Sequence, residues 1–281
     1  MILGSKRRQR ATTFLVAGML VMVAVYVLLP FAWMLTTSFK TVSESLRIPI
    51  TWLPEAPTLR NYVDMWRVKP FGRYFLSSTV ISGATAVLSS LLGSLAAYGL
   101  SRFPLRGKMV FLGGFLATQM ISGVLVIGPY FKIMAALGLY NTWASLIIAF
   151  VTICLPFSTW MQKGYLDTIP IAMDEAALMD GASRLRIFWQ VVLPLAMPGM
   201  VATTLFGFLL AWGDLLWAAT LASTDDVRTV TQGIAFTVGE FIVDWPMLSA
   251  ASTIGSVPSI LLYIFMQRYL VGGITAGAVK Q

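Results

Sequence analysis

The chain has 281 residues, of which 57% are hydrophobic and 11% are charged, whereas about a quarter of the residues in an ordinary soluble domain carry a charge. With no His and with Cys154 as its single Cys, the sequence excludes internal disulfides, Cys-based metal sites, zincin motifs and Ser-His-Asp arrangements. The 20 Lys and Arg against 12 Asp and Glu are scattered among short loops, which is typical of membrane topology rather than of a nucleic-acid-binding face.

The apolar stretches predict an all-α, polytopic membrane helix bundle. Each of six stretches reaches the roughly 20 residues that a helix needs to cross a bilayer. The first follows a basic N-terminus and is too long for a cleaved signal peptide. We therefore expect a peripheral span at 14–39, core spans within 75–270, and one transmembrane domain over 1–281. The six stretches are Phe14–Phe39, Phe75–Leu100, Met109–Phe131, Thr142–Met161, Met200–Leu221 and Met247–Leu270.

The basic residues predict how these spans are oriented. The loops 101–108 and 162–199 are short and basic, and such loops lie on the cytoplasmic side of a membrane. Both termini are then expected to be cytoplasmic. The first outer loop is basic as well, but it is longer, and the three prolines in its segment 49–57 predict an extended strap rather than a helix.

The second span carries small residues at a spacing of four. Small side chains let helix backbones approach closely in lipid, where no hydrophobic force drives helices together. Tight packing within the bundle explains the pattern, and a contact with another subunit is the alternative. The first stripe is Ser82, Ala86, Ser90 and Ser94, and Ser89, Gly93 and Ala97 lie beside it.

A polar segment between the fourth and fifth spans predicts a short helix that ends at a glycine. Pro170 suits a helix start, and Asp174 and Glu175 suit the positive end of the helix dipole. Gly181 is placed to stop the helix in a left-handed conformation. The segment is therefore expected to be structured rather than a flexible loop.

A second helix is expected to follow this turn. Ser183 is a candidate cap for a helix over Arg184–Val192, which Pro194 would break. In the first helix, Ala176 and Ala177 leave a shallow surface on which a partner's backbone could lie. The residues alone leave two interpretations open, a knob that docks into a partner's groove and an amphipathic helix that lies on the bilayer.

Fixed residues at fixed spacing in this segment resemble the EAA loop of ABC-importer permeases. The chain has Glu175-Ala176-Ala177-Leu178-Met179-Asp180-Gly181 and, after nine residues, Val191-Val192-Leu193-Pro194, with Val191 where the family usually has Ile. The segment 272–280 resembles the tail of the sugar-serving subfamily that includes the second maltose permease. Segments 52–54 and 57–62 resemble the first outer loop of that subfamily, so the resemblance extends over nearly the whole chain.

The resemblance implies a permease of a prokaryotic inner or plasma membrane. Its coupling loop, residues 164–199, would dock in a cleft of a separate ATPase subunit. Glu175 would face a basic residue of that ATPase, and the other motif residues are Ala176, Ala177, Asp180 and Gly181. The implied partners are a second permease chain, an ATPase dimer, an external solute-binding protein and membrane lipid, without nucleic acid.

The chain itself shows no phosphate-binding loop. Its one Gly-Lys pair, Gly107-Lys108, lacks the preceding Gly and the following Ser or Thr of that motif. We therefore expect ATP and Mg²⁺ on the partner ATPase and no cofactor on this chain.

An acidic residue, Asp214, falls inside the predicted fifth span, where an ionisable side chain should face the bundle interior. At helical spacing it shares a face with Gly207, Ala211 and Trp217, whereas Trp212 points roughly the other way. A carboxylate beside an indole suits the path of a sugar. The alternative is a buried Asp that bonds to a neighbouring helix for packing.

The sequence therefore predicts a permease subunit that forms half of the pathway for a carbohydrate, and the same subfamily also serves sugar alcohols and glycerol phosphodiesters. An intramembrane enzyme with Asp214 as general base would lack a second titratable group in the spans. A self-contained channel or secondary transporter would leave the EAA loop without a role. No catalytic and no metal-binding residue is expected.

Overall fold

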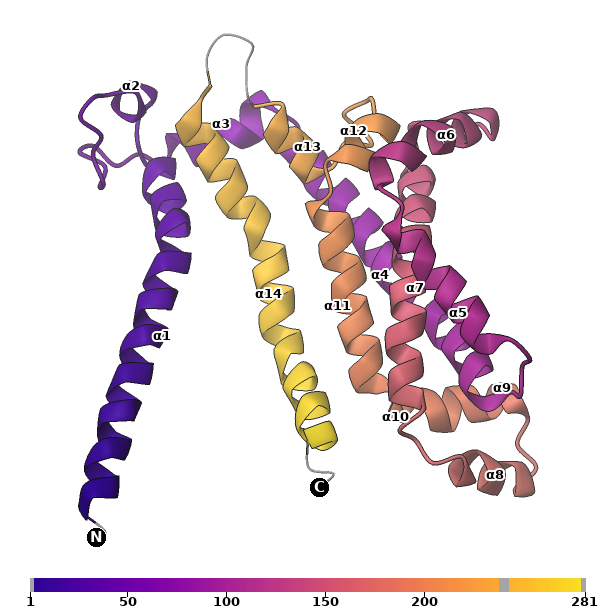
Figure 1. Ribbon diagram of the computed structural model, residues 1–281. Helices are drawn as coiled ribbons and strands as arrows, with labels where there is room; N and C mark the ends of the chain where they lie inside the picture. The colour runs from indigo at the N-terminus through magenta and orange to yellow at the C-terminus, as the bar shows by residue number, and fades with distance from the viewer. Residues whose placement is uncertain (1–2, 238–242, 279–281) are drawn as a thin grey trace. The chain divides into compact units, whose positions relative to one another are not determined.

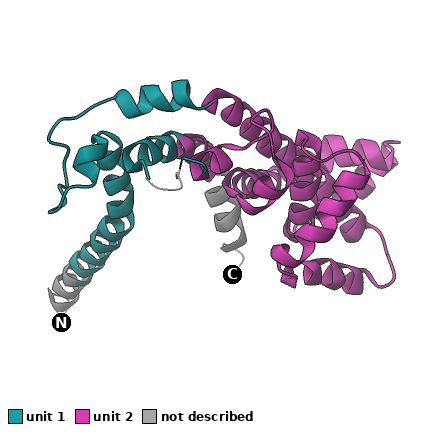
Figure 2. Ribbon diagram, turned by 90° about the horizontal axis from the view of Figure 1, so that it is seen from above, with its two compact units in different colours: residues 1–69, 236–254 teal, residues 70–235, 255–281 magenta. Residues whose placement is uncertain are grey.

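The computed structural model describes residues 3–237 and 243–278, with side chains over 12–237 and 243–268. Its regular elements are helices, and the predicted all-α fold is confirmed. Figure 1 shows the labelled helices coloured along the chain. The chain forms two compact units, coloured in Figure 2: residues 1–69 with 236–254, and residues 70–235 with 255–281. The expected single transmembrane domain with a peripheral first span stays a prediction.

The first unit holds α1 (Leu3–Ser38), α2 (Val42–Ser45), α3 (Arg60–Val68) and the first turns of α14 (Trp245–Ala278). No helix occurs between α2 and α3, as the prolines of the strap predict. The buried Asn61 amide donates to the carbonyl oxygens of Ser38 at 2.7 Å and Lys40 at 2.8 Å. These bonds hold α3 against the end of α1.

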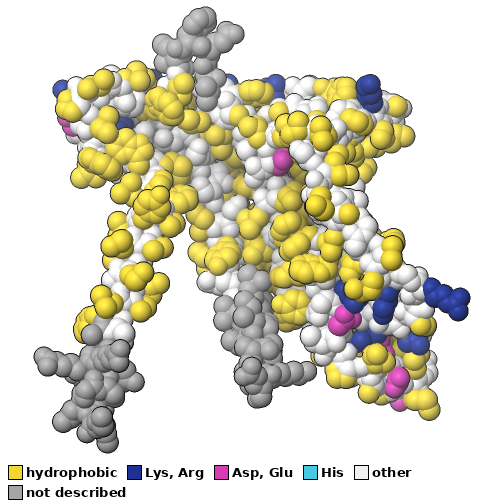
Figure 3. Space-filling model, viewed as in Figure 1, with side chains coloured by type: hydrophobic (Ala, Val, Ile, Leu, Met, Phe, Trp, Pro, Cys, Tyr) yellow, Lys and Arg dark blue, Asp and Glu magenta, His cyan; other side chains and the backbone are white. Residues whose placement is uncertain are grey.

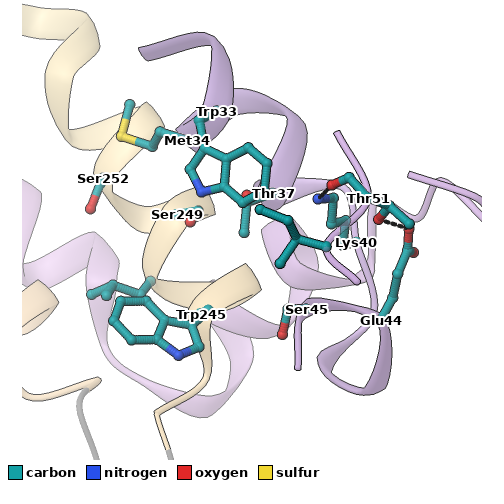
Figure 4. A pocket seen from close by; sticks show the side chains of 12 residues that line it. Trp33, Met34, Thr37, Lys40, Glu44, Ser45, Thr51, Trp245, Ser249 and Ser252 are labelled. Carbon is teal, nitrogen blue, oxygen red and sulfur yellow. Dashed lines mark hydrogen bonds between the residues drawn. The ribbon is translucent and has the colours of Figure 1, made fainter. Parts of the chain in front are cut away.

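A cavity of 430 Å³ in this unit is bordered by polar side chains that bond to one another (Figure 4). The buried Lys40 ammonium donates to the carbonyl oxygen of Thr51 and lies 4.3 Å from the ring centre of Trp33. The Glu44 carboxylate accepts bonds from the Thr51 hydroxyl at 3.1 Å and the Glu55 amide at 2.8 Å. Because Lys40 and Glu44 are both engaged by the strap, the cluster stabilises the strap.

The core of the second unit is a close contact of α4 (Phe71–Arg102) with α7 (Trp143–Leu166) and α11 (Met197–Gly213). The small residues predicted to form stripes on α4 are all buried. A Cβ atom on Gly93 would lie 2.8 Å from the Cβ of Ser158, so only Gly allows this approach. Packing within the bundle therefore accounts for the stripes.

Four polar side chains bridge these three helices. The Gln162 amide donates to the Thr203 hydroxyl and to the Ser90 carbonyl oxygen, each at 2.8 Å. Ser90 and Thr203 share a hydrogen bond of 3.0 Å, and Ser94 donates to Gln162. Buried polar groups that all find partners fix the relative positions of the helices that carry them.

The predicted third and fifth spans are wrong as continuous helices. The third is bent by 97° between Lys108–Met120, which comprises α5 (Lys108–Ala117) and η1 (Thr118–Met120), and α6 (Gly123–Ala136). Ile121 and Ser122 are extended there, which stops the helix. In the described residues, four helices are long and apolar enough to span a membrane, or up to six if each bent pair is one span.

The fifth predicted span, Met200–Leu221, ends early. Helix α11 ends at Gly213, Asp214 is extended, and α12 (Leu216–Leu221) begins a separate helix. The sequence pattern missed this break because the segment is apolar on both sides of it, and hydropathy reports burial rather than continuity. A further short helix, α13 (Val230–Ala235), follows.

Candidate functional site

The first helix of the coupling loop ends as its sequence predicts. Helix α8 (Ala172–Met179) is followed by Gly181 with φ of 78°, in the left-handed region. The amide of Ala182 bonds to the carbonyl oxygen of Ala177, and that of Gly181 to Leu178, each at 3.0 Å. This pair of bonds is the Schellman arrangement, which satisfies the last carbonyl groups of a helix.

The second helix begins as predicted and ends later. The Ser183 hydroxyl accepts a bond of 3.3 Å from the Arg186 amide at the start of α9 (Arg184–Ile187). The chain continues through the π-helical turn η2 (Phe188–Val192) into α10 (Leu193–Leu195). The predicted break at Pro194 is wrong, because a wider turn precedes it and the chain bends by 81° only after Leu195.

The two faces of α8 differ in exposure. Glu175 and Ala176 are exposed, as are Asp180 and Gly181 at the end of the helix. The Glu175 carboxylate forms no hydrogen bond or ion pair within the described part of the chain. Ala177 is half-buried and packs with Leu178 against a hydrophobic cluster. Four of the five predicted motif residues therefore lie on the surface, and Ala177 supports the helix from beneath.

Asp174, on the buried side of α8 next to the exposed Glu175, is a residue whose role the sequence did not reveal. Its carboxylate lies 3.3 Å from the Arg102 guanidinium, and their side chains are 1% and 3% exposed. The N–H is not aligned with that oxygen, so the contact is electrostatic. The Tyr98 hydroxyl donates to the other carboxylate oxygen at 3.2 Å. The available signal was helical spacing, which puts Asp174 on the face of the half-buried Ala177 and Leu178.

Charged side chains gather at the end of the second unit that carries α8 and α9, beyond a flank that is mostly hydrophobic (Figure 3). One of these groups is Asp167, whose carboxylate pairs with Lys163 at 2.5 Å and accepts a bond of 2.7 Å from Ser101. Burial acts to raise the pKa of Asp167, but the bonds from Lys163 and Ser101 outweigh it and hold the pKa below its ordinary value of 3.8. Asp167 is therefore a charged link between α7 and the end of α4.

Asp214 does not lie within a helix, which corrects its predicted position on one face with Gly207, Ala211 and Trp217. Its carboxylate accepts bonds from the backbone amides of Trp217 at 2.8 Å and Ala218 at 3.4 Å. An Asp that accepts such bonds caps the start of a helix, here α12. The half-buried carboxylate thus has local partners.

The two tryptophans beside Asp214 lie on different helices, Trp212 on α11 and Trp217 on α12, and contact different partners. The buried Trp212 donates its indole N–H to the Gly255 carbonyl oxygen at 2.9 Å. The Trp217 ring meets the Tyr130 ring edge to face, with centres 5.2 Å apart. Trp217 also borders a cavity.

This second cavity has a volume of 390 Å³ and lies at the bend of the predicted third span. Trp217 is 6% exposed, and within the described residues its hydrogen bond is that of the backbone amide to Asp214, so the indole N–H has no partner there. The Gln119 amide donates to Ile153 at 2.8 Å, which leaves its carbonyl oxygen as an acceptor. The other lining residues are Thr118, Ile121, Gly123, Val126, Tyr130, Ala149 and Thr152.

Comparison with known proteins finds close relatives over most of the chain. Residues 89–275 match the family described as "Binding-protein-dependent transport system inner membrane component". An inner membrane ABC transporter permease protein of Escherichia coli (strain K12) is 40% identical over 257 residues, which are 90% of this chain and 91% of that protein. A trehalose transport system permease protein of Mycobacterium tuberculosis (strain CDC 1551 / Oshkosh) is 34% identical over 277 residues, 97% of this chain and 98% of that protein.

A solved structure shares the fold. It is a bacterial ABC transporter involved in the import of the acidic polysaccharide alginate, and one of its chains matches with a TM-score of 0.81 and 23% sequence identity. The match covers 94% of this chain and 98% of that chain. This chain therefore has the same fold as that transporter chain.

Proposed function

Because this chain belongs to the family of binding-protein-dependent transport system inner membrane components, we propose that its coupling loop docks on a separate ATPase through the exposed face of α8. The chain is a membrane-spanning permease subunit of an ABC importer, not an enzyme. The observation that carries the docking proposal is the exposed Glu175, which forms no bond within the described chain. A cation on the ATPase would give it a partner.

The solute is proposed to be a carbohydrate. The trehalose transport system of the Mycobacterium tuberculosis relative supports this class, as does the subfamily resemblance of segments 52–62 and 272–280. A sugar alcohol or a glycerol phosphodiester is the second candidate, since both present the same hydroxyl groups. An external solute-binding protein would deliver it, and a second permease chain would complete the pathway.

The cavity beside Trp217 is the proposed part of the pathway in this chain. An unpartnered indole N–H can donate to a sugar hydroxyl, and the Gln119 carbonyl oxygen can accept from one. The apolar faces of Trp217 and Tyr130 can cover the C–H face of a sugar ring. Asp214 contributes indirectly, because its cap on α12 holds Trp217 in place. Trp212 contributes through the bond of its indole to Gly255, which holds α11 against α14.

In this proposal both termini and the coupling loop lie in the cytoplasm, and ATP with Mg²⁺ binds to the partner ATPase. The lack of a phosphate-binding loop in this sequence supports the binding of ATP by a partner subunit. The chain purified alone is expected to hydrolyse no ATP, and vanadate-sensitive hydrolysis should appear only when the ATPase subunit is added. Specific hydrolysis by the pure single chain would contradict the proposal.

A direct test measures docking. The chain carries an affinity tag, and the ATPase subunit that co-purifies from membranes is quantified per copy of the chain. Glu175→Lys should lose the ATPase, while Glu55→Lys, an exposed charge reversal on the strap, should retain it. Equal recovery with both variants would mean that α8 is not the docking element.

A further inference from the structure

The C-terminal end of α4 contacts the coupling loop at several points. Arg102 and Tyr98 both reach Asp174 in α8, at 3.3 Å and 3.2 Å. The Arg102 guanidinium also donates to the Ile169 carbonyl oxygen at 3.0 Å. Ser101, between them, donates to Asp167 at 2.7 Å. Three side chains in consecutive turns of one helix thus hold the segment 167–174 on both sides.

Aromatic contacts extend this attachment to the second helix of the loop. The Tyr98 ring lies 5.4 Å from the ring of Phe188 in η2. The Arg184 guanidinium of α9 lies 5.7 Å from the ring centre of Phe103, the residue directly after α4. The same end of α4 therefore meets both helices of the coupling loop.

The Asp174–Arg102 pair is the one buried ion pair among the six in the described residues. Exposed pairs contribute little to stability, whereas removal of one member of a buried pair leaves an uncompensated charge. Because this costly contact lies at the base of the proposed docking helix α8, it supports a role for the pair in transmitting movement of that helix. The pair also connects the buried side of α8 to the longest helix of the bundle core, α4.

We propose that Tyr98, Ser101 and Arg102 form a clamp, the α4 clamp, through which movement of α8 enters the membrane bundle, with Asp174 as the positioning residue that the clamp holds. From α4 the movement reaches α7 and α11 through the hydrogen bonds of Gln162 and Thr203 to Ser90. This inference rests on the proposed docking of α8. It adds that docking depends on the exposed side of α8 and coupling on its buried side.

The test uses the assembled importer, purified through a tag on this chain and reconstituted in liposomes with the solute-binding protein. Three quantities are measured: ATPase subunit recovered per chain, ATP hydrolysis stimulated by the loaded binding protein, and solute uptake per ATP. Asp174→Asn should retain the ATPase subunit but lower uptake per ATP by about tenfold or more, because the Arg102 charge is left unpaired. Glu175→Lys should lose the ATPase subunit itself.

Further variants separate coupling from folding. Tyr98→Phe keeps the aromatic packing and removes only the hydroxyl, so it should lower uptake per ATP by less than Asp174→Asn does. The exchange Asp174→Arg with Arg102→Asp should recover part of the uptake per ATP lost in Asp174→Asn. Asp64→Asn, which breaks the exposed Arg60–Asp64 pair, is the matched control and should change none of the three quantities.

The outcomes are distinguishable. Normal uptake per ATP in Asp174→Asn and Tyr98→Phe would overturn the α4 clamp while leaving the docking proposal intact. Retention of the ATPase subunit by Glu175→Lys would instead overturn the docking proposal. If Asp174→Asn does not accumulate in membranes, Tyr98→Phe decides, and normal uptake per ATP in Tyr98→Phe then counts against the clamp.

Discussion

Two helices of the second unit, α8 and α11, each have an acidic residue at or near their end, and the two residues differ in their bonds. At the end of α8 the chain turns through Gly181, and Glu175 is exposed without a bond in the described residues. At the end of α11 the chain turns through Asp214, whose carboxylate already accepts two backbone bonds. Asp214 attracted notice in the sequence because of its apolar surroundings, whereas Glu175 was marked only by a motif.

The difference shows that the bonds of a carboxylate are a better guide to its role than the hydropathy around it. A group whose partners are in its own backbone is explained by the fold. A group without partners, on a rigid surface, is available to another molecule. The same criterion favours Trp217, with its unpartnered indole N–H, over Trp212, which bonds to Gly255.

The largest effect is expected where a partner is missing from the chain. Glu175→Lys should weaken association with the ATPase by about 2 to 5 kcal/mol if the charge pair is buried in the complex. Co-purification at matched expression measures this, and Glu175→Gln should give an intermediate loss. If Glu175→Lys lowers the recovery of the ATPase subunit no more than Glu55→Lys does, the contrast drawn between Glu175 and Asp214 is wrong.

Removal of the Asp214 side chain should have the next largest effect. Asp214→Leu takes away the cap of α12 at a cost of about 1 kcal/mol and should strongly reduce uptake without preventing membrane insertion, since insertion of an uncharged residue is cheaper. Asp214→Asn can still cap and should retain most of the uptake. If Asn is as damaging as Leu, the negative charge itself is needed, and Asp214 belongs with Glu175 rather than opposite it.

A smaller effect is expected at Trp217. Trp217→Phe keeps an aromatic ring against Tyr130 but removes one hydrogen-bond donor, worth about 0.5 to 1.5 kcal/mol. The solute concentration for half-maximal uptake into liposomes that carry the assembled importer, with the binding protein added at a fixed concentration, should rise by roughly two- to tenfold. The matched change is Trp160→Phe, at a half-exposed indole on α7, and it should leave the half-maximal solute concentration unchanged. Equal shifts in both variants would mean that the cavity beside Trp217 is not part of the pathway.

The smallest effect concerns Asp167. Because its pKa in the folded chain lies below the ordinary value, the stability it contributes is present above that ordinary value of 3.8 and is lost as the pH falls through the folded pKa. Hydrogen exchange over 167–174 should therefore be faster in Asp167→Asn than in the wild type at pH 6. The two should converge once the pH has fallen below the folded pKa of Asp167. A difference that persists at low pH would show that the ionised carboxylate is not what holds this segment.

Composition and local signals were sufficient to predict much of the fold. Apolar length located the membrane helices, and a left-handed Gly with a following Ser gave the turn and cap at 181–183, because these features depend on nearby residues only. The bends after η1 and α11 were not predictable in this way. They separate apolar segments from apolar segments, so no change in hydropathy marks Ile121 or Asp214.

The candidate site was predictable to the same extent. The exposed motif residues follow from the EAA resemblance, but their division into faces does not. The partner of Asp174 lies 72 positions earlier in the chain, at Arg102, and spacing within α8 carries no information about it. The cavity beside Trp217 likewise depends on a bend in a different predicted span.

The buried contact between Asp174 and Arg102 has a consequence for chimeric permeases. The residues of the loop are contiguous, and their outer face looks suited to transplantation into a related subunit. If 164–199 were grafted into a subunit whose counterpart of α4 has no Arg at the position of Arg102, the Asp174 carboxylate would be buried without a partner charge. The coupling loop therefore depends on its contact with the end of α4, and a functional chimera must include the last turn of α4 together with the loop.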